Sequence, residues 1–302
     1  MSPEPRTGGS PGDSSQADAA AGPGDAANGA GSRGVVLRPA EFAERLRLTQ
    51  ASCAPSLRSW VDKYWSVTWD LPAGFEHRSS TAPPPAINLT YEYGGVSRDG
   101  AARPGWYVTG VISDRRFDVR QYGAGGVVGI RFRPGAFTSL TGLEAHLLRD
   151  KVIPVGKLLP SELLATPPPA ALGSAQAAAG HLDAVVAAMA RHARREPELD
   201  SLEAALAVMA DEHTVEVAAL ADAAGVSVRT LQRIFRRLVG VGPKWMLARA
   251  RLHDAIARLD AGYSGPLADL AAELGWFDQA HFTRDFTALV GVPPGDYRPA
   301  PP

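Results

Sequence analysis

Four arginines and no acidic residue lie between Val226 and Gly240 in the second half of the chain. The bias continues further, because seven Lys or Arg and no Asp or Glu lie between Val226 and Arg251. A guanidinium can donate two hydrogen bonds at once to a guanine edge or to a phosphate, so cations gathered on one surface favour a polyanionic partner. The formal net charge of the whole chain is only -1, so this basic surface is a local feature.

The element that must position these arginines is an amphipathic helix. Ser227 is a favourable N-cap, and Gly240 is a common residue at a helix C-terminus. The apolar residues follow the i, i+3, i+4, i+7, i+8 spacing of one helical face. They are Leu231, Ile234, Phe235, Leu238 and Val239. The pattern therefore predicts a helix that buries this stripe and points its arginines outward.

The same arrangement occurs twice. Leu220–Pro243 and Leu270–Pro294 both begin Leu-Ala, contain Arg-x-Phe and end with Leu-Val-Gly-Val-x-Pro. Each copy has the pattern of a short helix, a glycine-containing turn and a second helix, which is a helix-turn-helix unit. Pro243–Ala261 between them predicts one helix about 28 Å long. This length predicts that the two second helices enter successive major grooves, about 34 Å apart on a DNA duplex.

The two copies carry the motif of a known family. From Gly225 the first reads G-V-S-V-R-T-L-Q-R-I-F, and from Gly275 the second reads G-W-F-D-Q-A-H-F-T-R-D-F. Over Glu212–Arg298 the chain resembles the DNA-binding domain of the AraC/XylS transcription regulators, in which a long helix joins two helix-turn-helix units. Trp276 replaces the usual Phe and is expected to pack similarly. Ala280 replaces a polar base reader, which implies weaker base readout by the second unit.

The resemblance implies a set of DNA-contacting side chains. Arg229, Gln232 and Arg233 are placed toward base edges, where Arg can pair with guanine and Gln with adenine. Four further residues suit phosphates: Ser227, Thr230, Arg237 and Lys244. The full candidate set is Ser227, Arg229, Thr230, Gln232, Arg233, Arg237, Lys244, Gln279, Ala280, His281 and Arg284. Arg233 and Arg284 occupy the same place in both copies, so a scaffold role for them stays open.

The rest of the chain differs in character. Residues 1–34 are rich in Gly, Ala, Ser and Pro and predict a disordered tail. Period-two alternation over residues 35–165 predicts a small β-sandwich or barrel. The stretch Gly129–Ala136, which reads G-I-R-F-R-P-G-A, resembles the β-rich, cupin-like front domains of some family members. Residues 166–200 are expected to be a linker that contains a helix, and residues 201–298 the double helix-turn-helix domain. The predicted fold class is therefore α+β with two domains.

Several features of the front part leave alternatives open. Four tryptophans, Trp60, Trp65, Trp69 and Trp106, are expected to be core residues more than pocket residues. Arg131 and Arg133 share one strand face, with Arg115, Arg116 and Arg120 near them in sequence. This face predicts either a solvated surface or a site for an anionic effector. The glycine-rich Gly123–Gly129 is expected to form a turn, because it lacks the Lys-Ser/Thr of a phosphate-binding loop.

Enzymatic and membrane functions find little support in the sequence. Between residues 35 and 165 the only histidines are His77 and His146, so we expect no metal site, cofactor or catalytic residue. The single cysteine, Cys53, cannot form an internal disulfide, which fits a cytoplasmic protein. No apolar run approaches the ~18 residues of a membrane span. We expect no membrane partner.

These observations predict a sequence-specific DNA-binding transcription regulator that is not an enzyme. The expected partner is double-stranded promoter or operator DNA. RNA polymerase, a small-molecule effector and a second copy of the chain are further partners implied by the resemblance. Two alternatives stay open at this point. One is a DNA-organising protein without sequence preference, and the other is a cupin-like enzyme fused to a DNA-binding domain.

Overall fold

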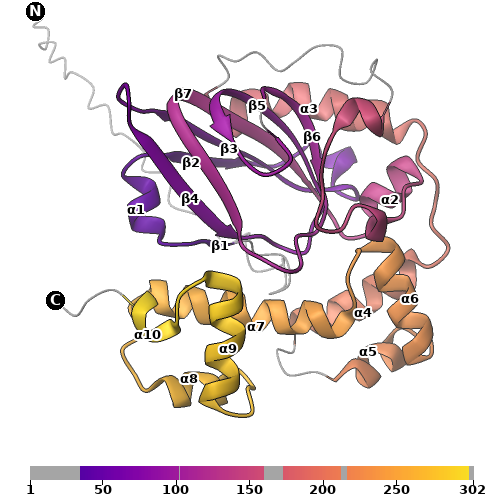
Figure 1. Ribbon diagram of the computed structural model, residues 1–302. Coiled ribbons are helices and arrows are strands. Elements are labelled where there is room, and N and C mark those ends of the chain that lie inside the picture. Colours follow the sequence, from indigo (N-terminus) through magenta and orange to yellow (C-terminus); the bar gives the residue numbers. More distant parts are fainter. Residues whose placement is uncertain (1–34, 102, 160–172, 212–215, 299–302) are drawn as a thin grey trace, which may run out of the picture.

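The computed structural model describes residues 35–101, 103–159, 173–211 and 216–298 (Figure 1). An antiparallel sheet occupies the first part of the chain, and the last part is entirely helical. This arrangement confirms the predicted α+β fold with two domains. The expected disordered tail at residues 1–34 lies outside the described residues.

The described part of the front domain contains one eight-stranded sheet. Its strands are β1 (Val35–Val36), β2 (Arg47–Ala51), β3 (Val61–Asp70), β4 (Glu76–Ala82), β5 (Asn88–Ser97), β6 (Gly105–Thr109), β7 (Phe117–Phe132) and β8 (Val152–Pro154). The 16-residue β7 lies at the centre. One side of β7 pairs with β5, and the other pairs first with β4 and then with β3. Short helical segments join the strands. They are α1 (Pro39–Ala43), η3 (Pro55–Leu57), α2 (Ala136–Thr141), η4 (Ala145–Leu147) and η5 (Val155–Lys157).

The glycine-rich stretch at residues 123–129 lies inside β7, so the predicted turn is wrong. Its glycines leave room for aromatic side chains of neighbouring strands. A Cβ atom on Gly125 would lie 2.7 Å from the ring of Trp69, and one on Gly129 would lie 2.7 Å from the ring of Trp65. The absence of side chains at these positions therefore allows the two tryptophans of β3 to lie across β7.

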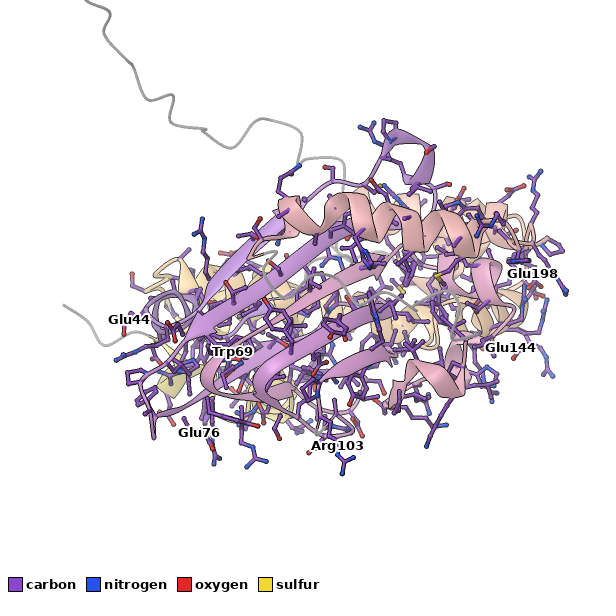
Figure 2. The ribbon with its side chains drawn as sticks, turned by 90° about the horizontal axis from the view of Figure 1, so that it is seen from above. Glu44, Trp69, Glu76, Arg103, Glu144 and Glu198 are labelled. Atoms are coloured by element: carbon purple, nitrogen blue, oxygen red, sulfur yellow. The ribbon has the colours of Figure 1, made fainter. Side chains whose placement is uncertain are left out.

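Helix α3 (Ala175–Ala190) covers one face of the sheet (Figure 2). It begins after Ser174, whose side chain accepts a hydrogen bond from the Ala177 amide. Its buried residues belong to the same apolar core as the inward-facing residues of β3, β5 and β7. They are Ala175, Ala178, Leu182, Val185, Val186 and Met189. Residues 166–200 were expected to be a linker that contains a helix, and α3 is a helix within this range whose small alanines pack closely against the sheet.

The helical domain contains two compact units on either half of one long helix. Its helices are α4 (Leu199–Asp211), α5 (Val217–Ala223), α6 (Val228–Leu238), α7 (Pro243–Asp260), α8 (Leu267–Glu273), α9 (Gln279–Val290) and α10 (Pro294–Tyr297). One apolar core joins α4, α5, α6 and the start of α7, and a second joins the end of α7 with α8 and α9. Figure 1 shows α6 and α9 near opposite ends of α7, below the sheet.

The sheet domain is docked along this helical domain. Leu37 and Ala82 are buried in the core of the second unit, and Val111 is buried in the core of the first. Polar contacts join the two domains at both ends of the interface. The Trp245 indole donates to the Ser113 carbonyl over 3.2 Å, and Arg116 Nη1 donates to the Val290 carbonyl over 2.7 Å. Both units therefore contact the sheet domain directly.

Candidate nucleic-acid interface

Helix α6 presents the basic face that the sequence predicts. Ser227 caps it, with Oγ accepting from the Thr230 amide over 3.2 Å. Leu231, Ile234, Phe235, Leu238 and Val239 are all buried, which confirms the predicted apolar stripe. The opposite face is therefore available to a partner. Ser227, Arg229, Gln232, Arg233, Arg236 and Lys244 are exposed, and Thr230 and Arg237 are half-buried.

Two of the candidate arginines bind acidic residues in this structure. Arg233 Nη2 forms an ion pair with Glu198 Oε1. Arg237 donates from Nη2 to Glu198 Oε2 over 2.9 Å and from Nη1 to Glu196 Oε2 over 2.6 Å. Burial alone would raise the pKa of Glu198, but the hydrogen bonds from Arg233 and Arg237 outweigh burial and lower it. Glu198 is therefore ionised at neutral pH and neutralises part of the basic face.

The sequence reasoning missed this acidic pair. Glu196 and Glu198 lie just before α4, 35 to 41 residues ahead of their arginine partners. Acidic residues before a helix are ordinary, because they interact favourably with its N-terminal end. No local pattern therefore indicates that these two carboxylates reach across to α6. Figure 2 places Glu198 at the end of the molecule opposite Glu44 and Glu76.

The second unit presents a corresponding helix, α9. Asp278 caps it, with Oδ1 accepting from the His281 amide over 2.7 Å. Gln279, Ala280, His281 and Arg284 are all exposed, and three of them line a shallow surface depression together with Thr283. His281 Nε2 lies 3.3 Å from Asp285 Oδ2. This face has fewer cations than that of α6.

Trp276 packs as the sequence predicts. Its side chain is buried, and its ring centroid lies 4.9 Å from that of Phe282. The indole also donates to Asp285 Oδ2 over 3.0 Å. The neighbouring Phe277 contrasts with it, because 93% of its surface is exposed.

The buried side of α7 carries two basic residues that face the sheet domain. The Arg249 guanidinium lies 4.5 Å from the centroid of the Trp245 ring and donates to the Ser113 carbonyl over 3.3 Å. Burial lowers the pKa of Arg249 to about 10, so it remains charged at neutral pH. Burial also lowers the pKa of His253 to about 3, helped by the positive charges of Arg249 and Arg131. His253 is therefore neutral in the folded protein.

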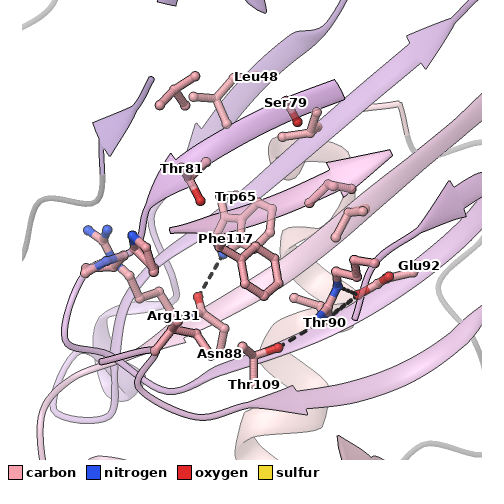
Figure 3. Close-up of a pocket in the computed structure, with 18 of the residues that line it drawn as sticks. Leu48, Trp65, Ser79, Thr81, Asn88, Thr90, Glu92, Thr109, Phe117 and Arg131 are labelled. Carbon is pink, nitrogen blue, oxygen red and sulfur yellow. Dashed lines mark hydrogen bonds and ion pairs between the residues drawn. The ribbon is translucent and has the colours of Figure 1, made fainter. Parts of the chain in front are cut away.

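The front domain contains a cavity of about 200 Å³ on the face of the sheet opposite α3 (Figure 3). Trp65 and Trp69 line it, whereas Trp60 and Trp106 pack against the apolar core under α3. Trp69 is also buried in a second apolar cluster, and Trp65 packs against that cluster. All four tryptophans therefore pack in apolar cores, and two of them also line the cavity. The Trp65 indole donates to Asn88 Oδ1 over 3.2 Å, which fixes its ring at the cavity wall.

The arginines of the front domain do not form one solvated face. Arg131 is 9% exposed and forms an ion pair with Asp62, so the expectation of a solvated Arg131 is wrong. Arg133, on the same side of the strand by alternation, is exposed. Arg115 and Arg120 are also exposed, and Arg116 is used in the contact with Val290. A single anion site formed by all five arginines is therefore absent from the described residues.

The described residues contain neither a metal-binding cluster nor a membrane-spanning helix. No group of three or more His, Cys, Asp or Glu within them could hold a metal ion. No helix among the residues that the structure describes combines the length and apolar character needed to cross a membrane. Cys53 is buried, and burial raises the pKa of its thiol.

Fold and surface together define a two-domain protein with a β-rich front domain and a double helix-turn-helix domain. Residues 220–300 match the family model described as a helix-turn-helix domain, and residues 49–154 match a domain of unknown function (DUF6597). The chain is 39% identical over 89 residues to an AraC-like transcription regulator of Streptomyces antibioticus and 40% identical over 85 residues to one of Streptomyces lividans. These alignments cover 30% and 28% of this chain. The chain therefore carries a helix-turn-helix domain, and this part of it is similar to AraC-like transcription regulators.

The chain spans only 29% and 28% of the length of these two relatives. Solved structures are also similar to it. One is a regulator with an AraC-type DNA-binding domain from Chromobacterium violaceum, with 24% identity, a TM-score of 0.30, and coverage of 32% of this chain and 88% of that one. Another is ToxT from Vibrio cholerae, with 11% identity, a TM-score of 0.39, and coverage of 84% and 97%.

Proposed function

We propose that the protein regulates transcription by binding double-stranded DNA sequence-specifically through α6 and α9. The observation that carries this proposal is the joint exposure of Arg229, Gln232 and Arg233 on the outer face of a capped helix. These are the side chains that can read guanine and adenine edges in a major groove. Candidate readers Gln279, His281 and Arg284 on α9 would occupy a second groove, and the 18 residues of α7 separate the two units.

The proposal is tested by measuring binding of the full chain to its own promoter region. Fluorescence anisotropy should show tighter binding to this DNA than to a scrambled duplex of equal length, with an affinity that falls as salt rises. Footprinting should show two protected segments about one helical turn apart. Equal affinity for both duplexes would favour the DNA-organising alternative and contradict sequence-specific regulation.

The remaining partners belong to the same proposal. The cavity of the front domain supports a small-molecule effector, because both aromatic and polar side chains line it. RNA polymerase and a second copy of the chain are partners that a transcription regulator of this type would have. A cytoplasmic location is part of the proposal, since the proposed target is promoter DNA. Neither the helix-turn-helix match nor the named relatives are enzymes, which supports a non-enzymatic role.

Replacing Arg233 with alanine is expected to relax base preference at one position of the site. Loss of one good arginine–guanine pair should weaken specific binding by about 1–3 kcal/mol and leave non-specific binding nearly unchanged. The matched variant Lys244→Ala, at an exposed cation proposed to bind phosphate, should weaken all sequences alike and reduce the salt slope by about one. Binding to a library of single-base variants measures both. Indistinguishable profiles would contradict this division of roles.

Replacing Glu198 with glutamine is expected to tighten DNA binding roughly fivefold, about 1 kcal/mol, the upper range for exposed ion pairs. The reason is that Arg233 must leave Glu198 before it can reach a base. Asp200→Asn is the control, because it removes the same charge from a neighbouring residue that pairs with Arg195 instead of α6. An equal gain in both variants would attribute the effect to overall charge, and no gain in Glu198→Gln would show that the pair does not compete with DNA.

A further inference from the structure

We propose that the cavity of the front domain binds an uncharged small molecule that carries a hydrogen-bond donor next to an acceptor, such as a primary amide, on an apolar body. This inference rests on the proposed function, because it names the chemistry of the effector that the front domain would sense. It is carried by one buried ion pair in the cavity wall, between Glu92 and Arg98.

The geometry of this pair leaves two polar atoms without a partner. Arg98 Nε donates to Glu92 Oε1 over 2.8 Å, and Arg98 Nη2 binds the same oxygen. Nη2 also donates to Thr109 Oγ1 over 3.3 Å. Glu92 Oε2 and Arg98 Nη1 are buried and have no hydrogen-bond partner among the described residues. Since buried polar groups are nearly always hydrogen-bonded, a free acceptor and a free donor on one pair point to a missing partner.

The burial of this pair excludes an ordinary surface contact. The Glu92 side chain is 1% exposed and that of Arg98 is 3% exposed. Two aromatic rings lie against the guanidinium, whose carbon is 4.8 Å from the centroid of Phe117 and 5.7 Å from that of Tyr107. The orientation of Arg98 is therefore fixed, and its free Nη1 cannot turn to a different partner without leaving these rings.

The surrounding wall sets the rest of the ligand chemistry. Most of it is apolar or aromatic, as Figure 3 shows around Trp65 and Phe117. The apolar lining includes Phe42, Trp65, Trp69, Ile112, Phe117 and Val127. The Trp69 indole is a further buried donor without a partner among the described residues. The volume of about 200 Å³ is more than ten times the roughly 15 Å³ that one water needs.

Charge balance among the buried ion pairs of the wall favours an uncharged ligand beside them. Lys63, which also lines the cavity, donates to Gln50 Oε1 over 3.1 Å. Glu92 compensates Arg98, and Asp62 compensates Arg131, the other buried arginine of the wall. An anion would accept a hydrogen bond from Arg98 Nη1 but would be repelled by Glu92 Oε2. A cation would donate to Glu92 Oε2 but would be repelled by the Arg98 guanidinium. A group that donates to Glu92 Oε2 and accepts from Arg98 Nη1 satisfies both atoms without adding a charge. An anionic effector at these arginines is therefore disfavoured.

Three molecules of nearly equal shape test the inference: benzamide, benzoate and benzamidine. Isothermal titration calorimetry on the full chain without DNA should show benzamide binding at least tenfold more tightly than either charged analogue. In Glu92→Gln the charge of Arg98 is no longer compensated, so the preference should change to benzoate. Glu76→Gln removes the same charge at an exposed residue of β4 bound to Arg78, and should keep the wild-type order.

The outcomes separate this inference from the proposed function. Tightest binding of benzoate or benzamidine to the wild-type protein, or no binding of any of the three, would overturn the inference. If Glu92→Gln folds and still binds the three molecules in the wild-type order of affinity, the inference is also overturned. If that variant does not fold, the order of affinities in the wild-type protein decides alone. If the protein binds none of the three molecules but prefers its own promoter, the inference is wrong and the proposed function stands. If it binds benzamide but not DNA, the proposed function is wrong and the ligand chemistry stands.

Discussion

Phe286→Ala is expected to lower the free energy of unfolding by about 3–5 kcal/mol, the cost of removing a buried phenyl group from a packed core. Phe286 is fully buried at the centre of the second unit. Its ring centroid lies 5.7 Å from that of Phe282 and 5.5 Å from that of Tyr297, both in edge-to-face contact. The substitution thus removes contacts that join α9 to α10. Urea denaturation followed by circular dichroism measures the loss.

The chain supplies a matched control for this prediction. Phe277, nine residues earlier, is 93% exposed, so Phe277→Ala removes the same atoms from a solvated position. It should change the free energy of unfolding by less than about 0.5 kcal/mol. In Phe286→Ala, footprinting should also show loss of the DNA segment protected by the second unit. Similar stabilities for the two variants would contradict the core described here.

Acidification is expected to destabilise the protein through His253. This residue of α7 is 2% exposed and lies between the long helix and the sheet domain. Burial is the main cause of its lowered pKa, about 3, and the charges of Arg249 on α7 and Arg131 on β7 act in the same direction. The backbone of Ala82 partly opposes them. In the unfolded chain the imidazole has an ordinary pKa of about 6.5.

The direction of the pH effect follows from these two pKa values. Above pH 6.5 the imidazole is neutral in both states, so its contribution to stability is complete. Between pH 6.5 and about 3 the unfolded chain binds a proton that the folded protein does not, and stability falls by about 1.4 kcal/mol per pH unit. From pH 6.5 to 4.5 the loss due to His253 should be about 2 kcal/mol.

Denaturation curves at several pH values test this effect. His253→Leu should lose about 2 kcal/mol less than the wild-type protein over the same two pH units. His192→Leu replaces an exposed histidine and should follow the wild-type curve. Parallel curves for all three proteins would show that His253 takes up its proton in the folded state and would contradict its burial.

Local periodicity made much of the fold predictable. The stripe from Leu231 to Val239 fixes which face of α6 is buried, because a helix places those side chains on one side whatever surrounds it. Alternation in the front part likewise indicated the strands. The domain content of the chain therefore follows from patterns that span no more than about a dozen residues.

The features that the sequence did not predict share one cause: each depends on residues that are distant along the chain. The glycines of β7 lie beside tryptophan rings of β3 that leave no space for a Cβ atom, and nothing within residues 123–129 indicates these distant neighbours. Arg131 is buried because Asp62, 69 residues away, forms an ion pair with it. The Arg237 contacts with Glu196 and Glu198 are of the same kind. The count of charges along the sequence therefore predicted the basic face of α6 but not its partial neutralisation by Glu196 and Glu198.

Two adjacent residues at the start of β7 contact two different parts of the molecule, the cavity of the front domain and the C-terminal end of α9. Phe117 lies in the cavity wall, and Arg116 holds the last carbonyl of α9, that of Val290. Their Cα atoms are separated by a single peptide unit of about 3.8 Å. A displacement of the Phe117 backbone would therefore also move the backbone of Arg116, whose side chain donates to the C-terminal end of α9.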